Sequence, residues 1–306
     1  MNICILTHGK GRFVRGSTYS TRKLYAAAVA RGHTVRVINA NLCYIQVDTD
    51  KPKVMYEGES LDNFDAVIPR IMPGMTGYGA AIVRQFEMQG VYTSARSIAI
   101  VRSRDKFRSI QLFSKNNVMI PKTIISRETA EVEDLIEQIG LPMIIKTARG
   151  TQGKGVVLAE TRKAAKSVIQ AFYVSGVNVL MQEYIEEAAG SDIRAFVVGN
   201  RVVASMKRQS LDDDFRSNLH QGGEGVAIKL TDEERKVALR AAKAMGLPIC
   251  GVDLIRSTKG PLVLEVNSNP GLEGIQKVTG RNVADKMIEY IELNAKRKNR
   301  KDRVGA

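Results

Sequence analysis

The chain has 306 residues, of which 44% are hydrophobic and 25% are charged, and its formal net charge is +14. This composition excludes a disordered chain, and the length predicts two or three subdomains rather than one compact core. No apolar stretch approaches the roughly 20 residues that a membrane-spanning helix needs. The first residues, MNICIL, carry no charged leader and predict a strand, so we expect a cytoplasmic protein with no membrane partner.

Basic residues are concentrated near the C-terminus but are not confined to it. Residues 296–303 supply six cations and one anion, which leaves a net charge of +9 for the rest of the chain. A field of this sign attracts ATP, carboxylate substrates, acidic peptides or nucleic acid, and charge alone does not choose among them. A basic tail of this kind is either merely solvated or a contact with the ribosome or RNA.

The N-terminal region predicts a small parallel α/β domain. The strand Asn2 to Leu6 is followed by a helical stretch that ends before Gly32, and then by the strand Thr34 to Asn39. A further apolar run, Ala66 to Pro69, precedes another helix. No G-x-G-x-x-G turn is present in this domain. The cationic, glycine-rich loop at 9–16 is either a contact for an anionic substrate or a mobile surface loop.

The middle of the chain predicts a phosphate-binding loop above a lysine. A helix start at Ser103 places Lys106 at the N-terminal end of a helix. The strand Pro142 to Thr147 carries Lys146, and the loop Gly150 to Gly155 leads into the next strand. Such a loop folds backbone N–H groups over phosphates, and Lys146 beneath it neutralises their charge. The G-K-[ST] ending of a Walker loop is absent, and an ordinary hairpin is the alternative for the loop taken alone.

Polar residues follow the next buried strands. Val179 to Tyr184 predicts a strand whose polar end is where the chain crosses between lobes, and adenine could pair with the backbone there. Strand alternation places Asp192 and Arg194 on one face of the following hairpin, where an internal ion pair is the alternative to a binding role. Arg216 lies in a polar loop, where a guanidinium could bind a carboxylate or an acyl phosphate.

Two apolar runs near the C-terminus carry oxygen ligands that indicate a metal site. Asp253 lies in ICGVDLIR, and Glu265 and Asn267 end PLVLEVN, so the segment predicts a β-hairpin. A three-residue turn with a left-handed Gly260 brings all three side chains to one face, whereas a two-residue turn directs Asp253 away. Such ligands suit Mg²⁺ or Mn²⁺, and Glu265 could bridge two ions. A solvated face is the alternative, but both acids lie in runs apolar enough to be buried, where an unpaired carboxylate is costly.

These residues together resemble the ATP-grasp superfamily and, within it, the RimK family, which attaches glutamate to the C-terminus of a small-subunit ribosomal protein. The resemblance spans nearly the whole chain, and its motifs are DAVIPRI at 65–71, RDK at 104–106, IIK at 144–146, GTQGKGV at 150–156, QEYI at 182–185, DIR at 192–194, DFRSNLHQGG at 214–223, GVD at 251–253 and LEVNSNPGLEGI at 264–275. EVN and NPG occur across many ATP-grasp ligases. FRSNLH with PGLEGI and the IPRI segment indicate the narrower group.

The resemblance implies an α/β (α+β) ATP-grasp fold in which a small N-terminal parallel α/β domain precedes two subdomains that sandwich the nucleotide. The expected boundaries are 1–95 for the N-terminal domain, 96–183 for the central subdomain with the glycine-rich loop, 184–295 for the C-terminal subdomain with the metal site, and 296–306 for the basic tail.

The resemblance also implies roles for individual residues. The ATP-binding positions are Lys106, Lys146, Gly153, Lys154, Glu183, Tyr184, Asp192, Arg216, Ser217 and Asn218, and the ligands of two Mg²⁺ or Mn²⁺ ions are Asp253, Glu265 and Asn267. Lys146 and Arg216 are the expected catalytic residues. In the implied reaction ATP phosphorylates a carboxylate, and an amine attacks the acyl phosphate to give an amide, ADP and phosphate. Positioning does most of the catalysis.

The expected substrates are ATP, L-glutamate and either a ribosomal-protein C-terminus or a glutamyl peptide, and free poly-α-glutamate is a further product. We expect a homo-oligomer. Three features depart from the family pattern: the inserted GKGRFVRG, Lys154 in place of a neutral aliphatic residue, and Asn269 in place of the serine of NASPG. The alternatives are a ligase with a small-molecule or carrier-protein acceptor, and a basic ribosome- or RNA-binding module whose ATP site is vestigial.

Overall fold

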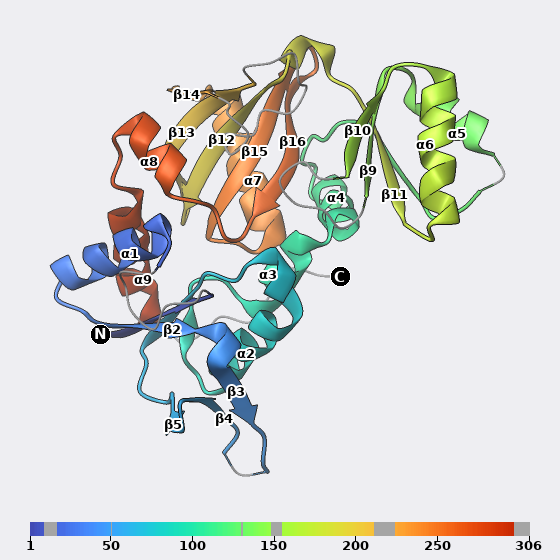
Figure 1. Cartoon of the computed structure of the whole chain (residues 1–306). Coiled ribbons are helices and arrows are strands. Elements are labelled where there is room, and N and C mark those ends of the chain that lie inside the picture. The colour runs from blue at the N-terminus through green and yellow to red at the C-terminus, as the bar shows by residue number, and fades with distance from the viewer. Residues whose placement is uncertain (9–16, 50, 130, 148–154, 211–223, 297–306) are drawn as a thin grey trace.

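The computed structural model describes residues 1–8, 17–49, 51–129, 131–147, 155–210 and 224–296. They form an N-terminal part, at the bottom of Figure 1, and two upper parts that are each built on an antiparallel sheet. The parallel N-terminal sheet and the antiparallel sheets that follow it confirm the predicted α/β fold class. None of the described helices is long and apolar enough to cross a membrane.

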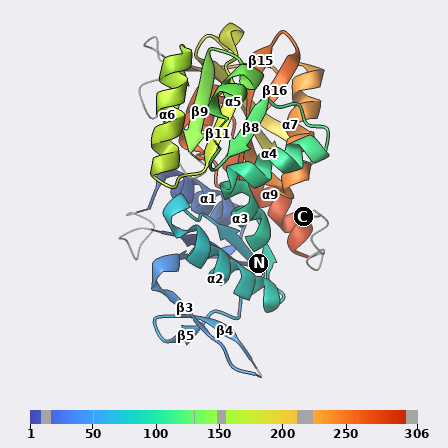
Figure 2. The ribbon, with the colours of Figure 1, turned by 90° about the vertical axis from the view of Figure 1, so that its right-hand side faces the viewer.

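The N-terminal part is a parallel sheet in the order β2-β1-β6-β7, because its strands are apolar runs separated by helices. Its elements are β1 (Asn2–Thr7), α1 (Tyr19–Ala30), β2 (Thr34–Asn39), β6 (Ala66–Pro69), α2 (Thr76–Met88) and β7 (Tyr92–Thr93). A small antiparallel sheet of β3 (Cys43–Gln46), β4 (Lys53–Tyr56) and β5 (Glu59–Ser60) projects from it, away from the two upper sheets (Figure 2).

The central sheet has the order β10-β9-β11-β8 and is antiparallel throughout. Its elements are β8 (Thr123–Ser126), α5 (Val132–Ile139), β9 (Met143–Thr147), β10 (Val156–Ala159), α6 (Arg162–Val174) and β11 (Val179–Glu183). Both helices cover the face that points away from the other upper sheet (Figure 1). Their apolar residues pack on the buried side chains of β9 and β11, which leaves the opposite face toward the five-stranded sheet.

The five-stranded sheet has the order β14-β13-β12-β15-β16. Its elements are β12 (Ser191–Val198), β13 (Arg201–Gln209), β14 (Glu224–Ala227), α7 (Asp232–Met245), β15 (Ile249–Ser257), β16 (Gly260–Asn267), α8 (Glu273–Thr279) and α9 (Val283–Ala295). Because strand side chains alternate, Val252 and Leu254 face the core that contains α7, and Asp253 faces the other side of the sheet. The sheet is therefore apolar toward α7 and polar where Asp253 lies.

Two helices link the N-terminal part to the upper parts, α3 (Ser97–Arg104) and α4 (Lys106–Lys115). Asp105 separates them and is the N-cap of α4, where its Oδ1 accepts a hydrogen bond of 3.0 Å from the Arg108 amide. The helix start predicted near Ser103 is thus two residues later, and Lys106 is its first helical residue. Three short 3₁₀ turns complete the described elements: Ala40–Leu42, Pro73–Met75 and Glu186–Ala188.

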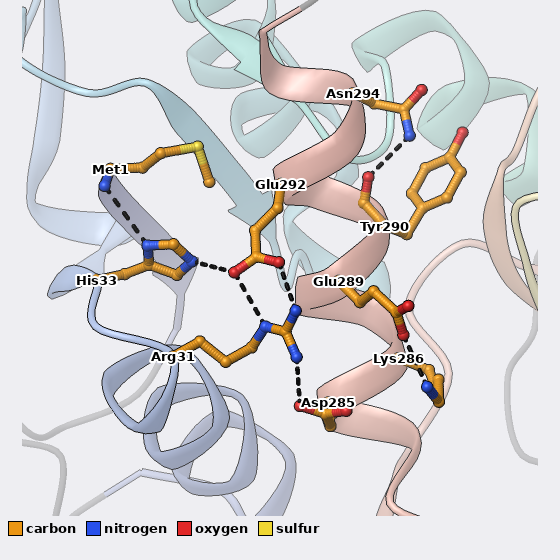
Figure 3. Close-up of polar contacts among 9 residues, drawn as sticks. All are labelled: Met1, Arg31, His33, Asp285, Lys286, Glu289, Tyr290, Glu292 and Asn294. Carbon is orange, nitrogen blue, oxygen red and sulfur yellow. Dashed lines mark hydrogen bonds and ion pairs between the residues drawn. The ribbon is translucent and has the colours of Figure 1, made fainter.

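Four polar side chains, Arg31, His33, Asp285 and Glu292, which we call the α1–α9 clasp, join the end of α1 and the start of β2 to the last helix (Figure 3). Glu292 accepts from Arg31 through both oxygens, at 2.9 and 2.6 Å, and its Oε1 lies 2.7 Å from His33 Nε2. The third Arg31 nitrogen, Nη1, lies 3.1 Å from Asp285 Oδ1. The clasp therefore holds the N-terminal sheet against the C-terminal helix with opposite charges.

Candidate functional site

The hairpin of β15 and β16 brings Asp253 opposite Glu265 by a route that the sequence analysis did not predict. Ser257 pairs with Gly260, so the turn has two residues, and a regular ladder would direct Asp253 away. An irregularity restores the register, because Leu254 pairs with Val263 whereas Asp253 pairs with Glu265. The extra residue on β16 is a β-bulge. The turn is thus the two-residue alternative, and the bulge rather than a three-residue turn brings Asp253 opposite Glu265.

The three predicted metal ligands converge on one amide. Asn267 Nδ2 lies 2.9 Å from Glu265 Oε1 and 3.4 Å from Asp253 Oδ2. Asp253 is 3% exposed, as its apolar run predicted, but Glu265 is exposed, and the expectation that both acids are buried was wrong for Glu265. Because β16 is the edge strand of the sheet, Glu265 keeps access to solvent.

The buried acid Asp253 belongs to a chain of ion pairs that we call the Asp–Arg ladder, formed by Asp192, Arg208, Asp253 and Arg194. Arg194 lies directly across from Asp253, and Asp192 directly across from Arg208, so strand register alone makes these pairs. Arg194 Nη2 is 2.6 Å from Asp253 Oδ2, Arg208 Nη2 is 3.0 Å from the same oxygen, and Arg208 Nε is 2.6 Å from Asp192 Oδ1. The internal ion pair considered for Asp192 is thus present, with Arg208 as its partner.

The ladder sets the charge states of both acids. Burial alone raises the pKa of Asp253, but the guanidinium groups of Arg194 and Arg208 outweigh burial and hold that pKa below its usual range. For Asp192, burial outweighs the attraction of Arg208, and its pKa is raised. Asp253 therefore stays ionised, which is the state a cation ligand needs.

Gly251 and Arg208 are parts of this site that the sequence analysis did not identify. A Cβ atom on Gly251 would lie 3.1 Å from both Arg194 Cδ and Pro270 Cβ. The glycine therefore lets Arg194 lie flat across β15 toward Asp253. Arg208 could have been identified from the alternation of β13, since a basic residue at a buried position of a strand needs an acidic partner.

Lys146 and Lys106 approach the site from the central sheet and α4. Lys146 Nζ donates to Gln182 Oε1 at 2.7 Å, and Lys106 Nζ lies 3.5 Å from the Thr147 carbonyl oxygen. Burial, together with the charge of Lys106, lowers the pKa of Lys146 to about 8. Burial also lowers the pKa of Lys106, whereas Glu265 acts in the opposite direction on both lysines. The two upper sheets thus bring lysine ammonium groups and Glu265 into one electrostatic neighbourhood.

Glu183 and Tyr184 lie where the chain leaves the central sheet for β12, as predicted. Glu183 Oε1 accepts from the Lys122 amide at 2.8 Å, and its Oε2 pairs with Lys259 Nζ at 3.1 Å. Because Lys259 is in the β15–β16 turn, Glu183 connects the crossing segment to the β15–β16 hairpin. Tyr184 is half-buried directly after β11.

Five predicted ATP-binding residues lie outside the described residues. They are Gly153, Lys154, Arg216, Ser217 and Asn218. The 9–16 loop and residues 297–306 of the basic tail also lie outside them.

The donor set fits a divalent cation. Each carboxylate has about four lone-pair positions, so Asp253 can bind a cation while it accepts from two arginines. The Asn267 amide group contacts both acids with its nitrogen, and a half-turn of the amide offers its oxygen to the same place. All donors are then hard oxygens, which Mg²⁺ and Mn²⁺ prefer. The described part of the chain contains no group of three or more His, Cys, Asp or Glu side chains that could hold a metal ion. The set proposed here is two acids and an amide.

Solved structures share this fold. Superposition on the ATP-grasp ligase PsnB complexed with minimal precursor, Mg and ADP gives a TM-score of 0.74 at 17% identity, covering 96% of this chain and 98% of that one. D-alanine–D-alanine ligase from Bacillus anthracis gives 0.69 at 16% identity, covering 97% and 98%. A RimK domain protein from Sphaerobacter thermophilus gives 0.67 at 19% identity, covering 95% and 100%. The fold is therefore ATP-grasp, and ATP-grasp ligases use ATP with divalent metal ions.

The chain is an ATP-dependent carboxylate–amine ligase. Residues 1–100 match the RimK PreATP-grasp domain and residues 103–291 match the RimK-like ATP-grasp domain, so the chain belongs to the RimK-like ATP-grasp family. It is 54% identical over 288 residues to a probable alpha-L-glutamate ligase of Vibrio cholerae, covering 94% of this chain and 96% of that protein. A protein of the same name from Hydrogenovibrio crunogenus is 55% identical over 286 residues, covering 93% and 95%.

Proposed function

We propose that this chain is an ATP-dependent α-L-glutamate ligase that adds glutamate to the C-terminus of a small-subunit ribosomal protein, and that it also makes free poly-α-glutamate. The observation that carries the proposal is the convergence of Asp253, Glu265 and Asn267 with Lys146, in a chain whose relatives named alpha-L-glutamate ligase align over nearly its whole length. The reaction passes through an acyl phosphate and releases ADP and phosphate.

The proposed nucleotide site lies between the central subdomain (96–183) and the C-terminal subdomain (184–295). Asp253, Glu265 and Asn267 would hold two Mg²⁺ or Mn²⁺ ions, which neutralise phosphate charge when bound. With a pKa of about 8, Lys146 is cationic at neutral pH and donates charge-assisted hydrogen bonds to phosphate oxygens. Lys106 adds a second ammonium group from the start of α4.

The remaining proposed residues orient the substrates. Glu183 and Tyr184 lie at the crossing segment, where the adenine end of the nucleotide would sit, and Asp192 acts through the Asp–Arg ladder on the metal ligand Asp253. Arg216, Ser217 and Asn218, with Gly153 and Lys154, would complete the contacts to the phosphates and the acyl group. We assign Arg216 to the developing negative charge on the acyl carbon's oxygens, because a guanidinium fits that geometry.

Two observations support a glutamate-rich protein acceptor over the alternatives. The chain is strongly basic outside its tail, and such a field attracts glutamyl chains. PsnB, which shares the fold, was solved with a precursor peptide. A homo-oligomer in the cytoplasm, with an RNA contact through residues 296–306, completes the proposal. A small-molecule or carrier-protein acceptor is the second candidate, because it would need the same nucleotide and metal residues.

Mass spectrometry of the products tests the proposal. The protein is incubated with Mg-ATP and L-glutamate, with and without a ribosomal-protein peptide that ends in glutamate. A ladder of glutamyl additions on the peptide, with ADP, supports the whole proposal. Free poly-glutamate alone supports the chemistry and overturns the ribosomal acceptor. If neither product nor ADP forms, the ligase assignment of these residues is wrong, and salt-sensitive RNA binding would then favour the binding-module alternative.

A matched pair of variants tests the site within the same assay. Glu265→Ala should abolish ADP formation without changing the melting temperature, because Glu265 is exposed on an edge strand. Glu289→Ala removes a partly exposed glutamate on α9 that pairs with Lys286, and should leave turnover unchanged. Turnover retained in Glu265→Ala would show that the metal site lies elsewhere.

A further inference from the structure

The carboxyl ends of β1 and β6 are a natural place for a second ligand. β1 pairs with β2 on one side and with β6 on the other, so the chain direction across the sheet reverses between β1 and β6. In open parallel sheets, ligands bind outside the carboxyl ends of the strands at such a switch point. Here the two strands end at Thr7 and Pro69, and the residues that follow them are His8 and Arg70.

Two arginines and an asparagine meet at the backbone that follows β6. Arg104 Nη2 and Asn269 Nδ2 both donate to the Ile71 carbonyl oxygen at 3.1 Å. Arg70 Nη2 donates to the Pro270 carbonyl oxygen at 2.9 Å, and its own backbone amide is fixed to Leu6 at 2.7 Å. We call His8, Arg70, Arg104 and Asn269 the Ile71 cluster.

The charges of the Ile71 cluster are not balanced by the described part of the chain. Arg70 is 7% exposed, yet it and Arg104 are bonded to neutral carbonyl groups, and no carboxylate of a described residue forms an ion pair with either. Three buried atoms, His8 Nδ1, Arg104 Nε and Asn269 Oδ1, have no hydrogen-bond partner among the described residues. A buried guanidinium group without an ion-pair partner, such as that of Arg70, is costly, and Glu265 acts on Arg104 electrostatically without forming an ion pair with it, so we look for a function other than stability.

The Ile71 cluster and the lysines share an electrostatic neighbour, Glu265. Glu265 interacts electrostatically with Lys146 on the central sheet and also with Arg104, which in turn acts on Arg70. Burial, followed by the repulsion of Arg104, lowers the pKa of Arg70 to about 10, so it remains cationic at neutral pH. Glu265 therefore interacts with two groups of cations, and phosphates bound by the lysines leave the arginines for a different anion.

We propose that the Ile71 cluster binds a non-reacting carboxylate of the incoming amino acid, with Arg70 and Arg104 as its donors. Paired guanidinium groups match the planar geometry of a carboxylate, and each such bond is charge-assisted. The inference rests on the proposed function for the identity of the amino acid, L-glutamate. It adds a subsite on the N-terminal sheet that is separate from the nucleotide and metal residues.

The competing explanation is that Arg70 and Arg104 only fasten the N-terminal sheet to the Pro270 segment. Both explanations predict that the hydrogen bonds to the Pro270 and Ile71 carbonyl groups are lost when the arginines are replaced, so the melting temperature does not distinguish them. They differ in the expected affinity for L-glutamate. If the arginines only hold the two segments together, replacing either one should change that affinity no more than replacing any other buried arginine. Arg102 is the matched control, since it lies on the same helix as Arg104, is 1% exposed and donates to the Met245 carbonyl oxygen at 3.0 Å.

The test measures L-glutamate binding by the shift of the melting temperature of the full chain, in the presence of Mg-ADP, and therefore does not depend on turnover. Arg70→Gln and Arg104→Gln should each weaken L-glutamate binding about 10- to 100-fold, the usual cost of a lost hydrogen bond to a charged group. Nucleotide affinity should change by less than about twofold, and Arg102→Gln should bind glutamate as the wild type does. L-Glutamine lacks the side-chain carboxylate, and L-isoglutamine lacks the α-carboxylate. The analogue that lacks the carboxylate bound by the cluster should bind weakly, and equally weakly to the wild type and to both variants.

Several outcomes overturn the subsite: no stabilisation of the wild type by L-glutamate, unchanged glutamate affinity in both variants, or an equal loss in Arg102→Gln. If Arg70→Gln does not fold, Arg104→Gln decides, because Arg104 is only half-buried. Failure of the proposed function looks different. In that case the wild type binds glutamate through the cluster but yields no glutamyl product. If instead both variants form products with an unchanged KM for glutamate, the subsite alone is refuted.

Discussion

The α1–α9 clasp and the Ile71 cluster both join the N-terminal sheet to the C-terminal part of the chain, but they balance their charges differently. In the clasp, Arg31 and His33 meet two acids, Asp285 and Glu292, at 2.6 to 3.1 Å (Figure 3). In the Ile71 cluster, Arg70 and Arg104 meet backbone carbonyl groups. Charges that are balanced within the chain fasten it together, whereas charges that lack a described counter-charge point to a ligand.

The Asp–Arg ladder extends the comparison to a third environment, because it is balanced like the clasp and buried like the cluster. Its four members alternate in charge along β12, β13 and β15. Removing one member of a buried, balanced set leaves an isolated charge, while removing an unbalanced cation relieves one. Substitutions in the ladder and in the clasp should therefore lower stability, whereas substitution of a cation that is held for a ligand should lower binding or activity.

The largest effect is expected in the ladder. Arg208→Met leaves Asp192 without its partner and Asp253 with one guanidinium, and should lower the free energy of unfolding by about 3–5 kcal/mol, measured by urea denaturation. Lys207→Met, the neighbouring position on the opposite face of β13, should change it by less than about 0.5 kcal/mol. The double variant Asp192→Leu with Arg208→Met should be more stable than Arg208→Met alone. A loss under about 1 kcal/mol in the single variant would contradict the ladder.

Lys146 tests the case of a cation that is held for a ligand, where activity rather than stability should fall. Lys146→Gln keeps a donor for Gln182 but removes the cation, and should lower kcat by about 10²- to 10³-fold, as the loss of a preorganised charge does at other phosphoryl sites. The melting temperature should stay the same or rise, because burial disfavours the lysine charge. Lys163→Gln, an exposed lysine on α6, should change neither quantity. A large loss of stability with retained turnover would reverse the interpretation of Lys146 as a ligand-binding cation.

The lowered pKa of Lys146 predicts a pH dependence of nucleotide binding. Above its pKa of about 8 the charged fraction falls roughly tenfold per pH unit, so the affinity for Mg-ADP should fall between pH 8 and 9.5 in the wild type. Lys146→Gln should lack this slope. Stability follows the reverse sign, because between about pH 8 and the ordinary lysine pKa of about 10.4 the unfolded chain holds a proton that the folded chain has released. The contribution of Lys146 to the free energy of unfolding therefore rises with pH in this window.

The sequence predicted the order of helices and strands because hydrophobic runs and their breaks are local properties. The strand Val156 to Ala159 is an example, whereas the pairing of Asp253 with Glu265 depends on a β-bulge. The β-bulge on β16 was not predictable, since a bulge depends on how two strands meet. The Ile71 cluster depends on Asn269 and Arg70, which lie 199 residues apart in the sequence, and only packing brings such positions together.

The smallest effect is expected at the clasp, because its members are partly exposed. Glu292→Gln should lower the free energy of unfolding by about 1 kcal/mol at pH 7, the upper range for a solvent-accessible ion pair, with turnover unchanged. Hydrogen bonds from Arg31 outweigh burial and lower the pKa of Glu292, so its contribution is complete above the ordinary glutamate pKa of about 4.3 and is lost as pH falls through the folded value. Wild type and variant should therefore become equally stable in acid, as urea denaturation across pH 3 to 7 would measure. A stability difference that persists in acid would mean that Glu292 acts through packing rather than charge, and the distinction between a balanced clasp and an unbalanced cluster would lose its physical basis.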